Sequence, residues 1–383
     1  MQKPPFFENL RKARFVKRLN RFAVECFIDD TIVQAHLPNP GRLWELLLPG
    51  RTVFLTAHDA SPGRSTGYTA VAVERDGALV LLHTQMANTV VKTLLEQNKV
   101  PGLENAEIIR QEASFGKSRF DFLLRKGRET MVLEVKSCTL YGKHMAMFPD
   151  AVTDRGRRHL LKLAALSAEG MTCGVIFLVH APHAQHFLPD YHTDIAFART
   201  FLDVKDTLTI KALGVTWNKD LSLGAEVRRL EIPWQFLSRE AEDRGSYMLI
   251  LHIPHTMEIP IGRLGQISFS EGYYIYVGSA KENLTKRMER HMRKRKSFFW
   301  HIDYLRDGAD TCVALPIRSS DPLEHEMAGA VGKIAGWSIP GFGSSDCSCA
   351  THLFSMQRNP LHCPAFIDLL QYFRMDRWGA DLR

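Results

Sequence analysis

The sequence has few cysteines and lacks a long apolar segment. Its 383 residues include seven cysteines, an odd number, and the N-terminal stretch MQKPPFFENLRKAR contains no apolar run. A disulfide framework is therefore not expected, and neither is a signal peptide or a membrane-spanning segment. These absences predict a cytoplasmic protein that does not associate with a membrane.

Acidic side chains are also in deficit. Lys and Arg total 49 against 42 Asp and Glu, which gives a formal net charge of +7. A basic balance favours a polyanionic partner, and nucleic acid is the first candidate. The length predicts two or three domains, and 45% hydrophobic residues are enough for their cores. We derive no oligomeric state from the sequence.

One stretch, residues 118–139, combines strand periodicity with three charges. Apolar residues alternate along two short segments, which predicts two half-buried strands joined by a polar turn at 125–130. Glu134 and Lys136 are two residues apart and project from one face of their strand. Asp121 is expected to lie across from them on the other strand.

This trio has a chemical use. Asp121 and Glu134 are candidate ligands of Mg2+ or Mn2+, which prefer oxygen donors, and such a metal activates a water. Lys136 is a candidate to orient the nucleophile or to stabilise negative charge. The alternative is a cross-strand salt bridge at the surface. The apolar flanks favour the catalytic interpretation, because ionised groups are costly in such a setting.

The D…ExK pattern resembles the PD-(D/E)xK nuclease superfamily, and longer segments resemble the sugar fermentation stimulation protein (SfsA) family. This second resemblance covers about residues 1–235. It implies an OB-type barrel, then a PD-(D/E)xK-like domain, and an association with DNA. The segments that carry it are FVKRLNRFAVEC at 15–26, AHLPNPGRLWELLLPG at 35–50, SRFDFLL at 118–124, EVKSCTL at 134–140 and FPDAVTDRGRRHL at 148–160.

Residues 13–83 carry strand signals at short intervals, which predict a small barrel within a first domain at 1–84. A loop rich in proline and glycine interrupts them. It presents His36, Asn39 and Arg42 either as DNA contacts or as part of a capped short helix that plugs the barrel.

The strand expected at 14–24 is basic. It is either a solvated strand or a contact for phosphate groups, and the net charge favours contact. Its candidate nucleic-acid ligands are Arg14, Arg18 and Arg21.

A second domain is expected at 85–235. Helices are predicted at 85–98 and at 153–168, the latter with Thr153 or Asp154 as N-cap, and a buried strand at 173–180. The order hairpin, helix, strand suits a mixed α/β fold. The second helix carries a basic stripe, either solvated or in contact with phosphate, and its candidate nucleic-acid ligands are Arg155 and His159.

The third domain, expected at 244–383, begins after a charged segment. Strands are predicted at 247–253 and 273–280, followed by a basic helix at 284–295. At helical spacing, four side chains share one face of this helix, and we predict that they contact phosphate. They are Arg287, Arg290, His291 and Lys294.

This third domain resembles the GIY-YIG nuclease fold, in an uncharacterised GIY-YIG-like family of α+β domains. Gly245-Ser246-Tyr247 and Tyr276-Val277-Gly278 stand at the two half-motifs, although the segment between them is longer than usual. The resemblance implies catalytic roles for Tyr247, Tyr276 and Arg287. It also implies a metal-binding glutamate, either Glu324 or Glu326, and the helical pattern favours Glu326.

Four residues near the C-terminus invite a zinc interpretation: Cys347, Cys349, His352 and Cys363. The spacing C-x-C-x2-H is tighter than the usual zinc knuckle, and His362 is an alternative partner. The pattern therefore favours reduced, buried cysteines over Zn2+.

The sequence predicts a DNA-binding protein with metal-dependent DNA phosphodiester hydrolysis, built from a barrel, a PD-(D/E)xK-like domain and a GIY-YIG-like domain. The alternative is a non-catalytic DNA-binding transcriptional regulator of sugar metabolism, in which the nuclease-like folds serve as binding platforms.

Overall fold

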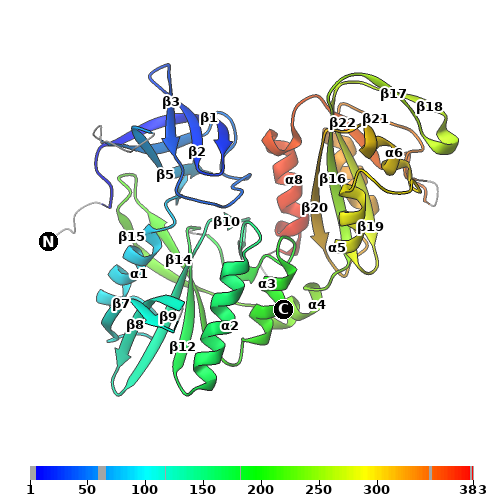
Figure 1. The fold of residues 1–383 in the computed structure, drawn as a ribbon. Coiled ribbons are helices and arrows are strands. Elements are labelled where there is room, and N and C mark those ends of the chain that lie inside the picture. Colours follow the sequence, from blue (N-terminus) through cyan, green and yellow to red (C-terminus); the bar gives the residue numbers. More distant parts are fainter. Residues whose placement is uncertain are drawn as a thin grey trace. The chain divides into compact units, whose positions relative to one another are not determined.

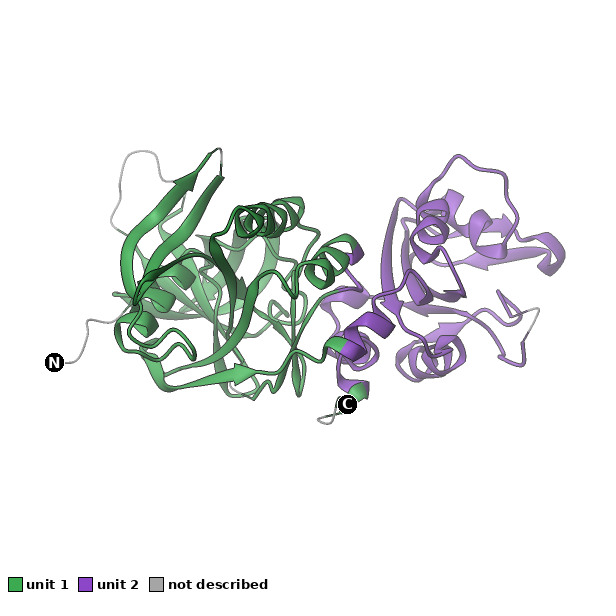
Figure 2. Ribbon diagram, turned by 90° about the horizontal axis from the view of Figure 1, so that it is seen from below, with its two compact units in different colours: residues 1–190, 196–234, 378–383 green, residues 191–195, 235–377 purple. Residues whose placement is uncertain are grey.

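The computed structural model divides the chain into two compact units (Figure 2). Unit 1 comprises residues 1–190, 196–234 and 378–383, and unit 2 comprises residues 191–195 and 235–377. Within the part of the chain that is described, no helix has the length and apolarity that crossing a membrane requires. The described residues are 6–58, 66–116, 118–181, 183–344, 347–379 and 382.

Unit 1 begins with the expected barrel (Figure 1). Its sheet has the order β3-β2-β1-β4-β5-β6, and a parallel pairing of β3 with β5 closes it. Asp29 and Asp30 form the turn between β2 and β3, and both have positive φ angles, as this class of two-residue turn requires. The OB-like barrel is therefore confirmed. Its strands are β1 (Leu10–Asn20), β2 (Ala23–Ile28), β3 (Thr31–His36), β4 (Thr52–Ala57), β5 (Tyr68–Arg75) and β6 (Ala78–Leu81).

The loop after β3 forms turns and no helix over residues 37–50, all of which are described. Its leucines Leu37, Leu43 and Leu46 are fully buried. The alternative of a short helical plug is therefore wrong, and apolar anchoring holds this loop in place.

The second layer of unit 1 is a mixed six-stranded sheet with the order β15-β14-β12-β9-β8-β7. β8 and β9 form the predicted antiparallel hairpin, and β12 runs parallel to both β9 and β14. β12 is buried from its second residue onward, as its continuous apolar sequence predicts. The strands are β7 (Glu107–Phe115), β8 (Ser118–Lys126), β9 (Glu129–Cys138), β12 (Thr172–Val179), β14 (Thr209–Trp217) and β15 (Leu223–Leu230).

Two helices bring side chains to this sheet. α1 (Met86–Glu96) packs on β7 and β9, and α2 (Asp154–Ala168) packs on β12. Thr153 is the N-cap of α2, and its hydroxyl accepts a hydrogen bond from the Gly156 N–H at 3.0 Å. The remaining short elements between β9 and β16 are β10 (Leu140–Tyr141), β11 (Met145–Phe148), β13 (His186–Pro189), α3 (Ile195–Asp203) and α4 (Trp234–Glu240).

Unit 2 is an α+β domain around an antiparallel sheet with the order β20-β16-β19-β22-β21. The long segment between the two half-motifs forms a separate hairpin of β17 (Met257–Pro260) and β18 (Gln266–Phe269), so β16 and β19 still pair directly. The sheet strands are β16 (Gly245–Ile253), β19 (Gly272–Ala280), β20 (Thr311–Arg318), β21 (Trp337–Ser338) and β22 (Leu353–Met356).

Four helices accompany this sheet. α5 packs on β16, β19 and β20, while α7 packs on β19 and on α8. α5 ends at Met292, three residues earlier than predicted. The helices are α5 (Leu284–Met292), α6 (His301–Gly308), α7 (Glu324–Ile334) and α8 (Pro364–Arg374).

Candidate active sites

In unit 1, the pairing of β8 with β9 brings Asp121 next to Glu134 and Lys136. Both carboxylate oxygens of Asp121 accept hydrogen bonds, one from the Val135 N–H at 2.7 Å and one from Asn88 Nδ2 at 2.6 Å. Asn88 belongs to α1, so helix and sheet together fix the position of Asp121.

Glu134 is the most buried member of this group, with a side chain 5% exposed. Its Oε1 atom accepts hydrogen bonds from Lys136 Nζ at 2.6 Å and pairs with His159 Nδ1 of α2 at 2.5 Å. Its Oε2 atom is buried and has no hydrogen-bond partner among the described residues. Because a buried carboxylate oxygen is costly without a partner, this atom is a candidate ligand for a cation.

The two carboxylates have opposite pKa shifts. Burial and the nearby Glu134 carboxylate raise the pKa of Asp121 to about 6. Burial also opposes ionisation of Glu134, but the hydrogen bond from His159 and the charge of Lys136 outweigh it and hold the pKa of Glu134 below its ordinary value. The site therefore concentrates more negative charge than its own lysine neutralises, a condition that a divalent cation relieves.

A groove of about 330 Å3 lies beside this trio within unit 1. Lys136 forms part of its wall, together with the segment 147–153. Arg21 and Arg155 also line it, so the groove carries positive charge next to the carboxylates. A basic groove of this kind suits a phosphodiester backbone.

In unit 2, a pocket of about 330 Å3 is lined by residues from β16, β19, α5, α6 and α7. Tyr247 of β16, Tyr276 of β19, Arg287 of α5 and Glu324 of α7 all line it. Glu326 is exposed and does not belong to this lining among the described residues. The preference for Glu326 therefore does not fit the geometry, because the first turn of α7 directs Glu324 to the pocket.

Close contacts fix three side chains of this pocket, Tyr247, Arg287 and Glu324. The Tyr247 hydroxyl lies 3.0 Å from His291 Nε2, and Arg287 Nη1 donates to the Ser279 carbonyl at 3.0 Å. Glu324 accepts a hydrogen bond from the Ser279 hydroxyl and lies 3.1 Å from His352 Nδ1.

Gly278 makes room for Tyr247. A Cβ atom at Gly278 would lie 2.5 Å from the Tyr247 hydroxyl oxygen, so only glycine allows this ring to reach the pocket. Burial and the neighbouring Tyr276 raise the pKa of Tyr247 well above its ordinary value. The Tyr247 hydroxyl therefore keeps its proton at neutral pH.

Comparisons with known proteins follow the same division of the chain. The SfsA N-terminal OB domain matches residues 16–82, the sugar fermentation stimulation protein RE domain matches residues 85–220, and a domain of unknown function, DUF123, matches residues 246–374. A sugar fermentation stimulation protein homolog from Methanothermobacter thermautotrophicus is 36% identical over 231 residues, which are 59% of this chain and 95% of the relative. The chain belongs to the sugar fermentation stimulation protein family.

Further relatives extend this family assignment. The homolog from Clostridium botulinum (strain Langeland) is 38% identical over 200 residues, which are 52% of this chain and 86% of the relative. The solved structure of Pyrococcus furiosus SfsA in complex with Ca2+ is 28% identical, with a TM-score of 0.54. It covers 58% of this chain and 95% of the SfsA chain. Relative to these SfsA proteins, the DUF123 match identifies the additional C-terminal domain.

Several residues predicted to bind nucleic acid hold the barrel loop together. Arg18 donates to the carbonyl oxygens of Gly41 and Arg42, at 2.6 and 2.8 Å. Asn39 is buried and donates to the Leu82 carbonyl. Arg42 donates to the Asp150 carbonyl at 2.8 Å, and its guanidinium lies over the Trp44 ring. These contacts give the three side chains a structural role.

The other predicted contacts of unit 1 differ in their surroundings. The guanidinium of Arg14 lies over the Phe27 ring at 5.4 Å. His36 and Arg155 are exposed, whereas His159 is held by Glu134. Arg21 follows the end of β1 and donates to the Pro40 carbonyl. Of this group, Arg21 and Arg155 line the groove beside Lys136.

The predicted basic face of α5 is only partly available. Arg290 donates bidentate hydrogen bonds to the Asp303 carboxylate at 3.0–3.1 Å. This carboxylate is fully buried, and Lys296 Nζ lies 2.8 Å from it. His291 is 2% exposed and lies 3.6 Å from Asp303. Lys294 lies beyond the end of α5 and is exposed. The four residues thus do not form one solvent-facing surface, because Arg290 and His291 lie against the buried Asp303.

The predicted zinc residues also regroup. Cys347, Cys349 and His352 lie together with His325, whereas Cys363, a described residue, lies outside this cluster at the N-cap of α8. All three of these cysteines are free. Sequence spacing did not identify His325, since it comes from α7 and meets the others only in the folded domain.

Proposed function

We propose that this protein is a metal-dependent DNA nuclease whose principal site is formed by Asp121, Glu134 and Lys136. The observation that carries the proposal is the buried, unpartnered Oε2 atom of Glu134 beside a second carboxylate whose pKa is raised. Both features are expected where a divalent cation completes the site.

The residues present fit Mg2+ or Mn2+. Asp121 and Glu134 would hold the ion, since both offer the oxygen donors that these cations prefer. When bound, the ion would stabilise charge on a phosphate and lower the pKa of a bound water. P. furiosus SfsA, a relative of this chain, was solved in complex with Ca2+, another cation that takes oxygen ligands.

The chain's own residues supply the remaining functions. Asn88 and the Val135 N–H orient Asp121, and His159 orients Glu134. Lys136 lies at the groove and places its ammonium where negative charge develops on a phosphate. Arg21 and Arg155 supply positive charge along the same groove, which suits the DNA backbone.

Unit 2 supports a second nucleolytic site, by its fold and by its pocket. Arg287 is exposed at the pocket and suits a phosphate oxygen. The protonated hydroxyl of Tyr247 positions a water rather than removing a proton from it. Glu324 is the carboxylate of this pocket that would hold a metal.

A cleavage assay tests the proposal. Purified full-length protein is incubated with supercoiled, linear and branched DNA in the presence of Mg2+, Mn2+ or EDTA. We expect cleavage that EDTA abolishes and that Glu134→Gln removes. DNA binding without cleavage in any metal would contradict the nuclease and support the alternative, a non-catalytic DNA-binding regulator.

A further inference from the structure

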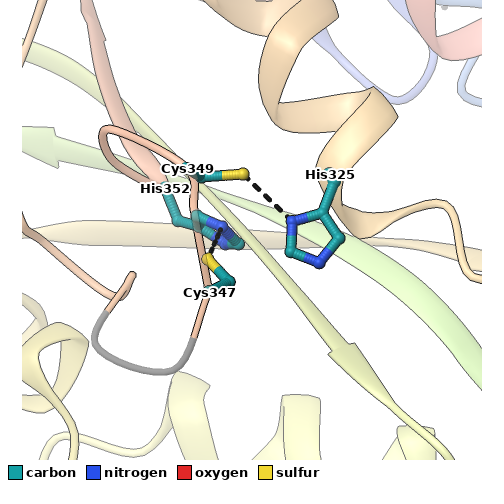
Figure 3. Close-up of side chains that lie close together, drawn as sticks. All are labelled: His325, Cys347, Cys349 and His352. Atoms are coloured by element: carbon teal, nitrogen blue, oxygen red, sulfur yellow. Dashed lines mark hydrogen bonds between the residues drawn. The ribbon is translucent and has the colours of Figure 1, made fainter.

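Four side chains of types that bind metal ions lie together in unit 2. They are distinct from the tyrosines, Arg287 and Glu324 that line the pocket. His325 comes from the first turn of α7, and Cys347, Cys349 and His352 come from the segment before β22 (Figure 3). Their ligand atoms all lie within 4.8 Å of one another. Figure 3 shows the two histidine rings and the two sulfur atoms directed toward a common point.

The distances within the cluster lie on either side of those in a tetrahedral zinc site. His325 Nδ1 lies 3.0 Å from Cys349 Sγ, and Cys347 Sγ lies 3.3 Å from His352 Nε2. Zinc bonds of roughly 2.0–2.3 Å place tetrahedral ligand atoms about 3.3–3.8 Å apart. The remaining separations, up to 4.8 Å, need only a small rotation of side chains, three of which lie on the segment before β22.

The donor set selects the ion. Two thiolates and two imidazoles are soft or borderline ligands, which bind Zn2+ and disfavour Mg2+ and Ca2+. We propose that His325, Cys347, Cys349 and His352 bind one Zn2+ ion. All four positions are occupied by protein ligands, so the ion is structural and leaves no open position for a substrate.

An outer hydrogen bond supports this assignment. His352 is 1% exposed, and its Nδ1 atom lies 3.1 Å from Glu324 Oε1 and 3.2 Å from the Val277 carbonyl. With Nε2 bound to zinc, Nδ1 carries the proton and donates it to these oxygens. Zinc-binding histidines typically pair their second nitrogen with a carboxylate or a carbonyl in this way.

The same contact links the zinc site to the pocket. Glu324 lines the pocket with Tyr247, Tyr276 and Arg287, so zinc on His352 fixes the carboxylate that faces the substrate. Glu324 is therefore a positioning partner of the zinc ligand and a pocket residue at once. This second step rests on the proposed function of unit 2, whereas the zinc site does not.

The ion would stabilise the loop that carries Cys347 and Cys349. Gly343 precedes the two cysteines, and a Cβ atom there would lie 2.8 Å from the Tyr276 ring. Zinc would tie this loop to α7 and so hold one wall of the pocket against Tyr276. Without the ion, two thiols and a solvent-exposed histidine hold the loop much less firmly.

Metal analysis of the full-length protein, purified under reducing conditions, tests the site. We expect one zinc per chain by elemental mass spectrometry. Cys349→Ser and His325→Gln should lose the ion, while Cys363→Ser, a cysteine of the same unit outside the cluster, should retain it. Replacement by Co2+ should give thiolate charge-transfer absorption in the parent and in Cys363→Ser, and none in Cys349→Ser.

Each contrary result has a definite meaning. A folded, reduced parent protein that binds neither Zn2+ nor Co2+ would overturn the site. A Cys347–Cys349 disulfide that persists in the protein purified with a reducing agent would do the same. So would full zinc content in the Cys347→Ser/Cys349→Ser double variant. Circular dichroism of Cys363→Ser and of the ligand variants separates lost metal from lost folding.

Glu324→Gln tests the link to the pocket. Loss of an outer partner should weaken zinc binding by about 10–100-fold, measured by competition with a chelator. Unchanged zinc affinity would overturn the link and leave the zinc site standing. Zinc binding in a protein that cleaves no DNA would reject the proposed function and leave the zinc site intact.

Discussion

The two candidate active sites neutralise their carboxylates in different ways. In unit 1, Lys136 and His159 both contact one oxygen of Glu134, and its other oxygen remains buried without a partner among the described residues. In unit 2, both oxygens of the single carboxylate, Glu324, already have partners in Ser279 and His352. The first site holds two carboxylates and one lysine, and the second holds one carboxylate beside Arg287 and His352.

This difference bears on metal binding. Burial, the larger cause, and the Glu134 carboxylate raise the pKa of Asp121 to about 6, and a bound cation would oppose both. Burial also opposes ionisation of Glu324, but its hydrogen bonds from His352 and Ser279 hold its pKa below the ordinary value. A divalent hard cation should therefore bind more tightly in unit 1 than in unit 2.

The largest expected effect concerns catalysis in unit 1. Lys136→Ala should lower the rate of DNA cleavage by about 10²–10³-fold, because it removes one preorganised charge from the transition state. Lys126→Ala, a matched change on the exposed end of β8, should leave the rate unchanged. Cleavage time courses under Mg2+ measure both variants. Equal rates for Lys136→Ala and the parent would place catalysis elsewhere, with unit 2 the next candidate.

The second prediction compares metal affinity directly. Asp121→Asn should weaken Mn2+ binding by at least about tenfold, or ~1.4 kcal/mol, because it removes an ionised ligand. Glu324→Gln should leave the tightest Mn2+ binding step unchanged. Calorimetric titration of the full-length variants gives both values. A larger loss in Glu324→Gln than in Asp121→Asn would reverse the comparison.

Local pattern explains what the sequence could predict. Alternation along residues 118–139 predicts the hairpin that carries Asp121, Glu134 and Lys136, because strand periodicity and face are local properties. Asn88 was not predicted, since it reaches Asp121 from a helix 33 positions away, with no local signal.

For a related reason, helical spacing does not predict which side chains of α5 face solvent. Spacing shows which side chains share a face, but Asp303, which binds Arg290 from a different helix, decides which way that face points. Likewise, His325 joins the cysteines, and Glu324 the tyrosines, through the position of α7 in the fold. Such partners are set by tertiary packing, which a spacing pattern does not contain.

The third prediction concerns the stability of unit 2 and its dependence on pH. Burial opposes ionisation of Asp303, but hydrogen bonds from His291, Arg290 and Lys296 outweigh it and hold the pKa of Asp303 far below its ordinary value. Asp303→Asn should destabilise unit 2 by on the order of 3 kcal/mol at neutral pH, because it leaves two cations without their buried partner. Denaturant unfolding, followed by unit 2 tryptophan fluorescence, measures the loss.

The sign of the pH dependence follows from the lowered pKa. A carboxyl whose folded pKa is depressed contributes stability above its unfolded pKa, and that contribution is lost as pH falls below it. The difference in unfolding free energy between the parent and Asp303→Asn should therefore be largest at neutral pH and shrink below about pH 4. A difference that grows toward acid would contradict the network.

The smallest expected effect separates the two kinds of basic residue near α5. Lys294 is exposed beyond the helix, whereas Arg290 is bound to Asp303. A lysine that neutralises a DNA phosphate releases counterions, so Lys294→Ala should flatten the plot of log affinity against log salt by about 0.9. Arg290→Ala should instead lower the unfolding free energy of unit 2, because it removes a partner of the buried Asp303 carboxylate.

Salt titrations of the full-length variants on duplex DNA, paired with denaturant unfolding, assign each residue to one class. A flattened slope in Arg290→Ala with unchanged stability would show that Asp303 releases this arginine to DNA.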